Sequence, residues 1–120
     1  MTPETWKRAA PLIERALRYQ DSHTLGDVLD AIKDGHAQLW CGSKSVIVTE
    51  ILKAPHKRYC RVWLAGGDMD ELVNVMLPDV EAWAVKRRCQ AVQVCGRHGW
   101  ARVLKDYAQP RVVLEKEIGS

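Results

Sequence analysis

The sequence lacks several of the signals that assign a protein at once. It has no phenylalanine, no Cys-x-x-Cys pair, and no apolar run approaching the ~18 residues of a membrane-spanning helix. Zinc-ligand spacing, a Walker phosphate loop and a dinucleotide-binding glycine fingerprint are missing as well. These absences argue against a metal site, and against the nucleotide sites that short motifs reveal.

The net charge of the chain is also small. It is formally +3, whereas nucleic-acid binders usually carry a stronger and more clustered basic surplus. The first residues, Met1 to Trp6, lack the basic and apolar regions of a signal peptide, so we expect a cytosolic protein. Buried, reduced thiols are therefore favoured over disulfides or metal ligation for the four cysteines, which are Cys41, Cys60, Cys89 and Cys95.

The length and composition are those of an ordinary globular domain. A chain of 120 residues can bury one real core, and 47% of its residues are hydrophobic against 28% charged. We therefore expect a single domain over residues 1–120.

The middle of the chain predicts a strand–helix–strand–helix unit. Tyr59–Leu64 is rich in β-branched and aromatic residues and is followed by the glycines of Ala65–Gly67. A long helix is expected from Asp68 to about Arg88, and then a second strand over Ala91–Cys95. The turn Gly96–Gly99 leads into another helix near its end. Two strands joined by such a helix favour parallel pairing with a right-handed crossover.

Pro78 interrupts the long helix, where we expect a kink or two helices that meet. The basic run Lys86–Arg88 at its end suits the helix dipole, an interpretation favoured over a nucleic-acid patch. One apolar stripe keeps both pieces on the same sheet face. It consists of Leu72, Val75, Met76, Val80, Trp83 and Ala84.

Two helices are expected at the start of the chain. The first runs from Pro3 to about Tyr19 with Thr2 as its cap, and Pro11 bends or divides it. The second begins at Thr24, where Thr24-x-x-Asp27 resembles a capping box, and ends at Gly35.

The remaining apolar stretches predict strands. Ala37–Cys41 and Ser45–Leu52 flank a tight turn and, with the strand at Tyr59, form an antiparallel meander. Arg111–Ile118, after Pro110, is expected to supply a last strand. The predicted fold is α+β: two N-terminal helices, the meander, and the βαβα core in one mixed sheet.

Particular stretches resemble a known family. Gly66–Glu71, Glu81–Ala84, Cys89 and Gly96–Leu104 are similar to segments of the small GNAT-like (Gcn5-related N-acetyltransferase) proteins of tailed bacteriophages. The resemblance extends from Ala37 onward. It implies the GNAT fold, whose element order matches the prediction above, although the usual first strand is missing.

The resemblance also implies where acetyl-CoA would bind. In the family, a loop between the third antiparallel strand and the central helix holds the pyrophosphate, which here corresponds to Leu64, Gly66, Gly67 and Asp68. The basic residue that opens the family's loop is absent. The carboxylates of Asp68, Asp70 and Glu71 fall in the first turn, where capping the helix is favoured over binding phosphate.

The family's catalytic tyrosine has no direct counterpart, because Leu104 falls at its position. Tyr107 lies about one turn later and is a candidate acid, with core packing as the alternative. Candidate general bases are Glu50, His36, His56 and His98. Of the histidines, His98 has the most suggestive setting, in a turn, where a surface or capping role is the alternative.

The turn and helix after the second core strand have the composition of a protein interface. Exposed tryptophan next to arginine is typical of interface hot spots, and this stretch contains Arg97, His98, Trp100 and Arg102. Core packing is the favoured alternative for any single tryptophan.

Three functions follow from these features. The leading hypothesis is a phage-type GNAT-fold protein that works through protein contacts in virion assembly, packaging or ejection, without acetyl transfer. Its partners would be virion proteins or a second copy of itself, and its location the host cytoplasm or the virion. The alternative is an acetyl-CoA-dependent N-acetyltransferase. A third, weaker hypothesis is DNA binding through Lys86–Arg88 with Arg97 and Arg102.

Overall fold

A computed structural model describes residues 1–19, 22–96 and 99–119. Along the chain it contains two helices, three strands, a long helical stretch, a fourth strand and a last short helix. Their bounds are α1 Pro3–Leu17, α2 Leu25–Lys33, β1 Ala37–Cys41, β2 Val46–Lys53, β3 Arg58–Gly66, α3 Met69–Glu71, η1 Leu72–Met76, α4 Leu77–Lys86, β4 Ala91–Val94 and α5 Gly99–Val103.

Side-chain caps define where the first helices begin. The hydroxyl of Thr2 accepts a hydrogen bond from the N–H of Thr5 at 3.1 Å, and Pro3 occupies the first turn of α1. Thr24 and Asp27 form the predicted capping box of α2, with reciprocal bonds of 3.2 and 2.8 Å. Pro11 does not divide α1, which runs unbroken to Leu17.

The described strands form one mixed sheet in the order β1-β2-β3-β4. The first three are antiparallel neighbours, as in the predicted meander, and β4 pairs parallel to β3. The tight turn between β1 and β2 is closed by the bond from the N–H of Gly42 to the carbonyl of Ser45, at 2.8 Å.

Two helical segments, η1 and α4, meet beside Pro78, which is one of the two predicted outcomes. The preceding stretch, η1, widens into a π-helical turn, in which the N–H of Leu77 donates to the carbonyl of Leu72. Because proline has no N–H to donate, a helix that continues through Pro78 leaves a carbonyl in the preceding turn without its usual partner. The wider turn ends where α4 begins, and the helical stretch continues without a break.

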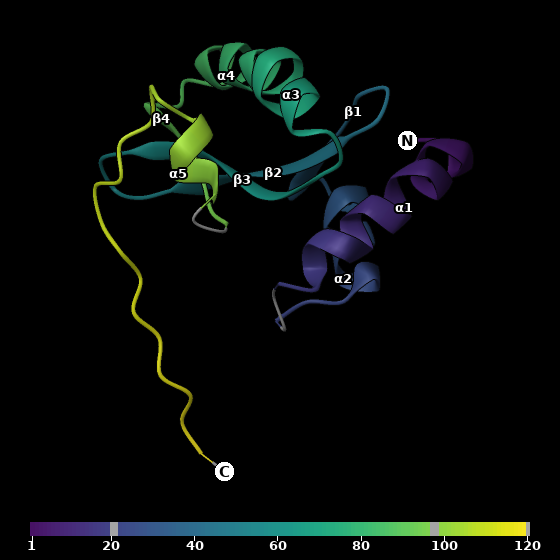
Figure 1. Ribbon diagram of the computed structural model, residues 1–120, viewed down its shortest axis with the longest axis horizontal. Helices are drawn as coiled ribbons and strands as arrows, with labels where there is room; N and C mark the ends of the chain where they lie inside the picture. The colour runs from purple at the N-terminus through teal and green to yellow at the C-terminus, as the bar shows by residue number, and fades with distance from the viewer. Residues whose placement is uncertain (20–21, 97–98, 120) are drawn as a thin grey trace.

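Helices cover both faces of the sheet (Figure 1). α1 and α2 lie on one face, and the stretch from α3 to α4 lies on the other. The first core consists of Ala9, Ile13, Leu17, Val28, Ala37, Val46, Val48, Trp63 and Leu64. The second consists of Ile47, Cys60, Val62, Leu72, Met76, Leu77, Val80, Ala84 and Leu104.

The last predicted strand is wrong: Arg111–Ile118 has no strand assignment in the described chain. After Tyr107 the chain leaves the body of the molecule as an extended segment (Figure 1). Strand-type residues form a strand only when a neighbour supplies ladder hydrogen bonds, and this segment pairs with none of the strands that the structure describes.

The cysteines depart from the expected burial at two positions. Cys60 is buried, but Cys41 and Cys95 are exposed, and all four thiols are free. Cys41 is the last residue of β1 and Cys95 follows β4, so both lie at the end of a strand.

Candidate functional site

A cleft opens where β3 and β4 diverge. Their pairing ends at Val62 and Val94, after which a single long bond of 3.4 Å joins the N–H of Cys95 to the carbonyl of Val62. β3 continues to Gly66, whereas β4 has already ended. The space between the separated ends has a volume of about 910 Å³. Its walls include Leu12, Ala16, Trp63, Leu64, Gly66, Gly67, Val94, Gly96 and Trp100.

A β-bulge bends β3 at the cleft. Val48 of β2 faces Leu64 while Thr49 faces Val62, so Trp63 is the extra residue on β3. Trp63 is 8% exposed, and its ring meets the ring of His23 edge-on, at 4.9 Å between centroids. The bulge therefore turns β3 away from its parallel neighbour and seats an aromatic ring at the cleft.

Both glycines that follow β3 are required by close packing. Gly67 has φ +121°, and a Cβ there would lie 2.5 Å from Cα of Ser45 and even closer to the carbonyl oxygen of Lys44. A Cβ on Gly66 would lie 2.9 Å from the carbonyl oxygen of Leu12 in α1. The glycine loop is thus wedged between α1 and the β1–β2 turn, and it lines the cleft at the same time.

The carboxylates after the loop are engaged by the protein. Asp68 is the N-cap of α3, and its Oδ1 accepts from the N–H of Glu71 at 3.0 Å. Oδ1 of Asp70 accepts from Nδ2 of Asn74 at 2.7 Å. The capping role that the sequence favours for Asp68 is therefore present in the structure.

Glu71 holds the β1–β2 turn. Its Oε2 accepts from the N–H and the hydroxyl of Ser43, and its Oε1 accepts from the N–H of Lys44 at 2.9 Å. The hydroxyls of Ser43 and Ser45 and the N–H of Lys44 lower the pKa of Glu71 to about 2. Glu71 is therefore ionised at neutral pH, and its charge is directed at the turn.

Basic side chains reach the cleft from segments distant in sequence. Arg15 and Arg18 come from the end of α1, and Lys44 comes from the β1–β2 turn. Glu115 is the one carboxylate on the described wall. This excess of positive charge gives the cleft a potential that attracts anions. No local motif reveals these three residues; the i, i+3 spacing of the arginines on one helix face was the only available signal.

Tyr107 lies away from the cleft, against the core under α4. Its hydroxyl donates to Oε2 of Glu81 at 2.6 Å. Burial, followed by the bond to Glu81, raises the pKa of Tyr107 well above its usual range. Leu104, which takes the family's tyrosine position, is buried in the same core.

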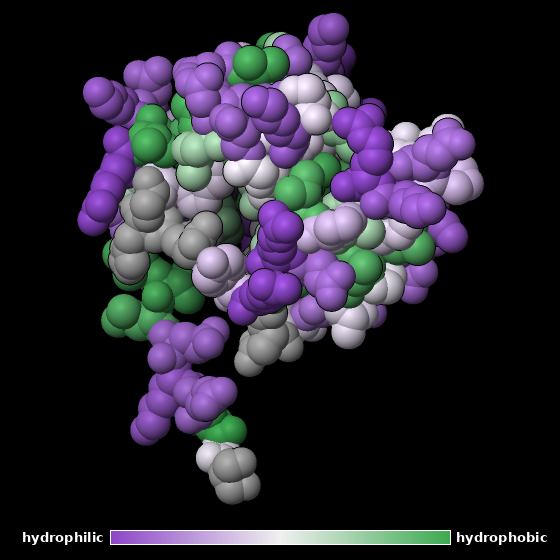
Figure 2. All heavy atoms as spheres, turned by 45° about the vertical axis from the view of Figure 1, so that its right-hand side comes forward, coloured by the Kyte–Doolittle hydropathy of each residue, from purple (hydrophilic) through white to green (hydrophobic). Residues whose placement is uncertain are grey.

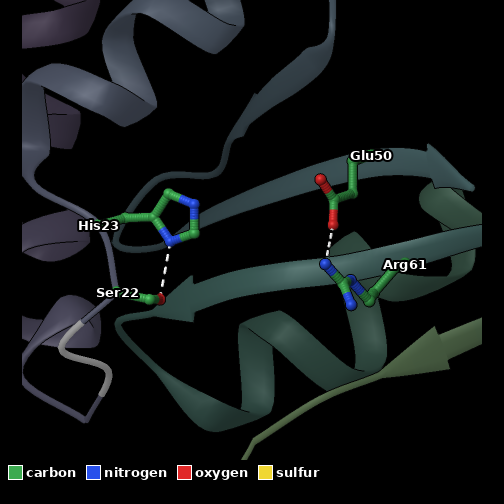
Figure 3. A network of polar contacts seen from close by, with 4 residues as sticks. All are labelled: Ser22, His23, Glu50 and Arg61. Atoms are coloured by element: carbon green, nitrogen blue, oxygen red, sulfur yellow. Dashed lines mark hydrogen bonds and ion pairs between the residues drawn. The ribbon is translucent and has the colours of Figure 1, made fainter.

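Glu50, one of the candidate general bases, is bound to a neighbouring side chain. It faces Arg61 across β2 and β3 and forms an ion pair with it. Figure 3 shows this pair together with Ser22 and His23 of the loop before α2, where the Ser22 hydroxyl and Nδ1 of His23 are 2.8 Å apart. No pattern in the sequence singles out His23, because only the fold brings it to Trp63.

The other predicted site residues are scattered. Trp100 lines the cleft, whereas Arg102 is exposed on α5. His36 and His56 are exposed, away from the cleft wall. Arg97 and His98 lie outside the described residues.

Two kinds of feature are absent from the described residues, a metal-binding cluster and a membrane-spanning helix. These residues contain no group of three or more histidine, cysteine or acidic side chains that could hold a metal ion. None of the helices described is both long and apolar enough to cross a membrane.

No protein-family model matches the chain, and no curated protein matches its sequence. Solved structures do match its fold over nearly the whole length. TTHA1254 of Thermus thermophilus superposes with a TM-score of 0.68 at 18% identity, covering 100% of this chain and 95% of that one. A mutant of BH1408 from Bacillus halodurans gives 0.69 at 7% identity, covering 98% and 96%.

A third match has a named activity. The aminoglycoside antibiotic 6'-N-acetyltransferase AAC(6')-IG of Acinetobacter haemolyticus superposes with a TM-score of 0.60 at 8% identity, covering 99% of this chain and 97% of that one. The chain is thus an α+β protein with a mixed sheet covered by helices on both faces. More particularly, it has a GNAT-like fold.

Proposed function

We propose that this protein binds a coenzyme A thioester in the cleft between β3 and β4 and transfers its acyl group to an amine. The observation that carries the proposal is the placement of Arg15, Arg18 and Lys44 on the wall of that cleft. They supply the positive charge that the glycine loop itself lacks. The cleft also lies at the strand-to-helix loop, where the family resemblance expects acetyl-CoA.

The parts of the ligand match the parts of the cleft. Its phosphates would lie near the arginines of α1 and near Lys44, since cations favour phosphate binding. The methyl and methylene groups of its pantetheine portion would lie against Trp63, Leu64 and Trp100. Beyond Val62, the described part of β3 has a strand neighbour only on its β2 side, so its other edge faces the cleft. That edge can exchange hydrogen bonds with the amides of the ligand.

The transfer step needs few protein groups. The amine nitrogen attacks the thioester carbonyl, a C–N bond forms, the C–S bond breaks, and the amine proton ends on the departing thiol or in water. Tyr107 and Glu50 are bonded to Glu81 and Arg61 instead, so neither is assigned a catalytic role. The proposal therefore assigns this chain the binding and orientation of the thioester.

Titration calorimetry with acetyl-CoA tests the binding step. In moderate salt we expect micromolar affinity, on the order of −8 kcal/mol. The variant Arg15→Glu should weaken binding about tenfold or more, or ~1.4 kcal/mol. Lys7→Glu on the same helix is the matched control, because it changes the net charge equally away from the cleft wall. Absence of binding at millimolar ligand, or equal loss in both variants, would overturn the proposal.

Transfer is tested separately, by release of free thiol from acetyl-CoA in the presence of primary amines. Amine-dependent release that Arg15→Glu slows would support the transferase. Normal binding without release would reduce the proposal to a thioester-binding protein.

The exposed segment after Tyr107 favours a second candidate function, action through protein contacts. Four large aliphatic side chains of this segment are more than 60% exposed: Val112, Val113, Leu114 and Ile118. The phage origin, the virion role and partners, and the location in host cytoplasm or virion stay predictions from the sequence resemblance. Mixing the purified chain with virion proteins of a tailed bacteriophage would test the virion role. Absence of any association would count against that role.

A further inference from the structure

Two basic turns meet at the end of the sheet that lies away from the cleft. One is the turn between β2 and β3, closed by the 2.8 Å bond from the N–H of Ala54 to the carbonyl of Lys57. The other follows α4 and leads into β4. β3 begins at Arg58 beside these turns and reaches the cleft at its other end, roughly 25 Å away along the strand.

Arg58 joins the two turns. Its N–H donates to Oε1 of Gln90 at 2.7 Å, and its carbonyl accepts from the N–H of Gln90 at 2.8 Å. Its Nη1 donates to the carbonyl of Arg87 at 2.9 Å. The two turns therefore form one surface, here called the basic end, which comprises residues 53–58 and 86–90.

The basic end concentrates the positive charge of the chain. Its cationic side chains are Lys53, Lys57, Arg58, Lys86, Arg87 and Arg88. All of them except the half-buried Arg58 are exposed. Neither segment contains an aspartate or a glutamate, and the whole chain carries only +3, so the remainder of the chain is net negative. Such a concentration of one charge creates a local potential that attracts polyanions.

Arg88 occupies a backbone position that favours glycine. It follows the C-cap of α4 with φ +61°, and no other non-glycine residue in the described part of the chain has a positive φ. A glycine would adopt this conformation without strain. A strained position that carries a charged side chain points to a function for that charge.

The side chains of the basic end are suited to phosphate. The planar guanidinium of an arginine binds a phosphate through two parallel hydrogen bonds. Lys57 lies over the ring of Tyr59, 5.2 Å from its centroid. Arg87 lies over the ring of Trp83 at 5.6 Å. Because cations already cover these rings, they are not offered to unpaired bases, and the surface fits the dense phosphates of a duplex better than a single strand.

Little apolar surface accompanies these charges. Val85, next to Lys86, is 73% exposed, but the two turns, whose residues are all described, contain no exposed large apolar side chain. In the space-filling view hydrophobic surface gathers instead where the segment after Tyr107 leaves the body of the molecule (Figure 2). Surfaces that bind membranes combine basic side chains with an inserted apolar face. One exposed valine is too little for such a face.

We propose that the basic end binds the phosphate backbone of duplex nucleic acid, without reading its base sequence. Its lysines and arginines contact phosphates, which supply nearly all the affinity of non-specific binding. The sequence-based hypothesis of DNA binding joined residues 86–88 to Arg102, whereas the fold joins them to Arg58. The site is separate from the cleft, so it stands whether or not the cleft binds a thioester.

Fluorescence anisotropy of a short labelled DNA duplex, titrated with the full chain, tests the proposal. At ~0.1 M salt we expect a dissociation constant of roughly 1–100 μM, unchanged when the base sequence is changed. Lys86→Glu should weaken binding about tenfold and make it less dependent on salt. Lys33→Glu is the matched control, because Lys33 is also an exposed lysine at the end of a helix. The control should bind within about twofold of the wild-type chain.

Arg88→Gly separates binding from stability. The variant loses a cation and relieves the positive φ, so its Tm should rise while its affinity for the duplex falls about threefold or more. A role of Arg88 in the fold alone would not weaken binding in a more stable chain. Unchanged affinity in both Arg88→Gly and Lys86→Glu would overturn the proposal.

Further outcomes would also overturn it. One is the absence of binding at low salt, and another is an equal loss in Lys86→Glu and Lys33→Glu, which would show attraction by overall charge. A larger loss in Arg15→Glu than in Lys86→Glu would place the duplex in the cleft. Tighter binding of the single strand, of polyglutamate or of vesicles containing phosphatidylserine would identify a different partner.

Discussion

Glu71 and Ser43 join the start of the central helix to the turn between the first two strands. Oε2 of Glu71 accepts from the N–H of Ser43 at 2.9 Å and from its hydroxyl at 2.5 Å. The next N–H, of Lys44, bonds the other oxygen. Through this contact a carboxylate near the cleft positions a lysine on the cleft wall.

The Glu71 contact predicts an acid-dependent stability. The pKa of Glu71 is lowered from 4.5 to about 2, mainly by the Ser43 hydroxyl, then by Ser45 and Lys44. A lowered folded-state pKa means that this contribution is complete above pH 4.5 and is lost as pH falls toward about 2. Between these values the Tm of the wild-type chain should fall more steeply than that of Glu71→Gln, as measured by circular dichroism.

Glu14→Gln is the control for this measurement. Glu14 is exposed, and no hydrogen bond to its carboxylate occurs in the part of the chain that the structure describes. Its variant should keep the wild-type slope. If Tm fell with pH at the same rate in the wild-type chain and in Glu71→Gln, the bonds to Ser43 would not be maintained in solution.

Gly67→Ala is expected to destabilise the fold itself rather than ligand binding alone. Gly67 has φ +121°, and a Cβ there would overlap the backbone of the β1–β2 turn. Backbone strain and overlap together should lower the free energy of unfolding, measured by urea denaturation, by more than ~2 kcal/mol. Gly35→Ala is the control: it also has a positive φ, of +79°, but nothing lies within 4 Å of the added Cβ. Gly35→Ala should lower the free energy of unfolding by only ~1 kcal/mol. If Gly67→Ala lowered it by the same amount, the β1–β2 turn must move aside for the new methyl group.

Tyr107→Phe should reduce stability without changing affinity for acetyl-CoA. The variant loses the 2.6 Å bond to Glu81, which should cost ~1–2 kcal/mol. The pKa of Tyr107 is raised above 10, so its contribution is complete below pH 10 and is lost as pH rises further. Tyr59→Phe, a change of the same kind on β3, is the control. A loss of affinity in Tyr107→Phe would return this residue to the list of candidate acids.

The pair of Glu50 and Arg61 predicts a structural rather than a catalytic effect. The two side chains are 22% and 34% exposed, so their coupling should be only ~0.5–1 kcal/mol in a double-mutant cycle of Glu50→Gln and Arg61→Gln. Added salt should weaken it. If Glu50→Gln instead slowed acyl transfer while binding stayed normal, Glu50 would be the general base.

The helix starts and the hairpin were predicted correctly because their causes are local. Thr2 and Thr24 cap helices through bonds to residues three positions away. Such contacts form as soon as the chain turns, whatever the rest of the molecule does. The same holds for Asp68, whose capping role follows from its place before the central helix.

The predictions that failed depended on distant partners. The sequence of Arg111–Ile118 is that of a strand, but β4 and this segment do not meet in one molecule. The basic residues of the cleft were not predicted, because Arg15 and Lys44 reach it only after α1 has packed across β3 and Glu71 has fixed the turn. The sequence by itself determined the caps, periodicities and strand-forming stretches, which act over three or four residues. The tertiary structure alone decided where β3 and β4 separate and which charges face the opening, because both depend on how segments far apart in the chain pack on the two faces of the sheet.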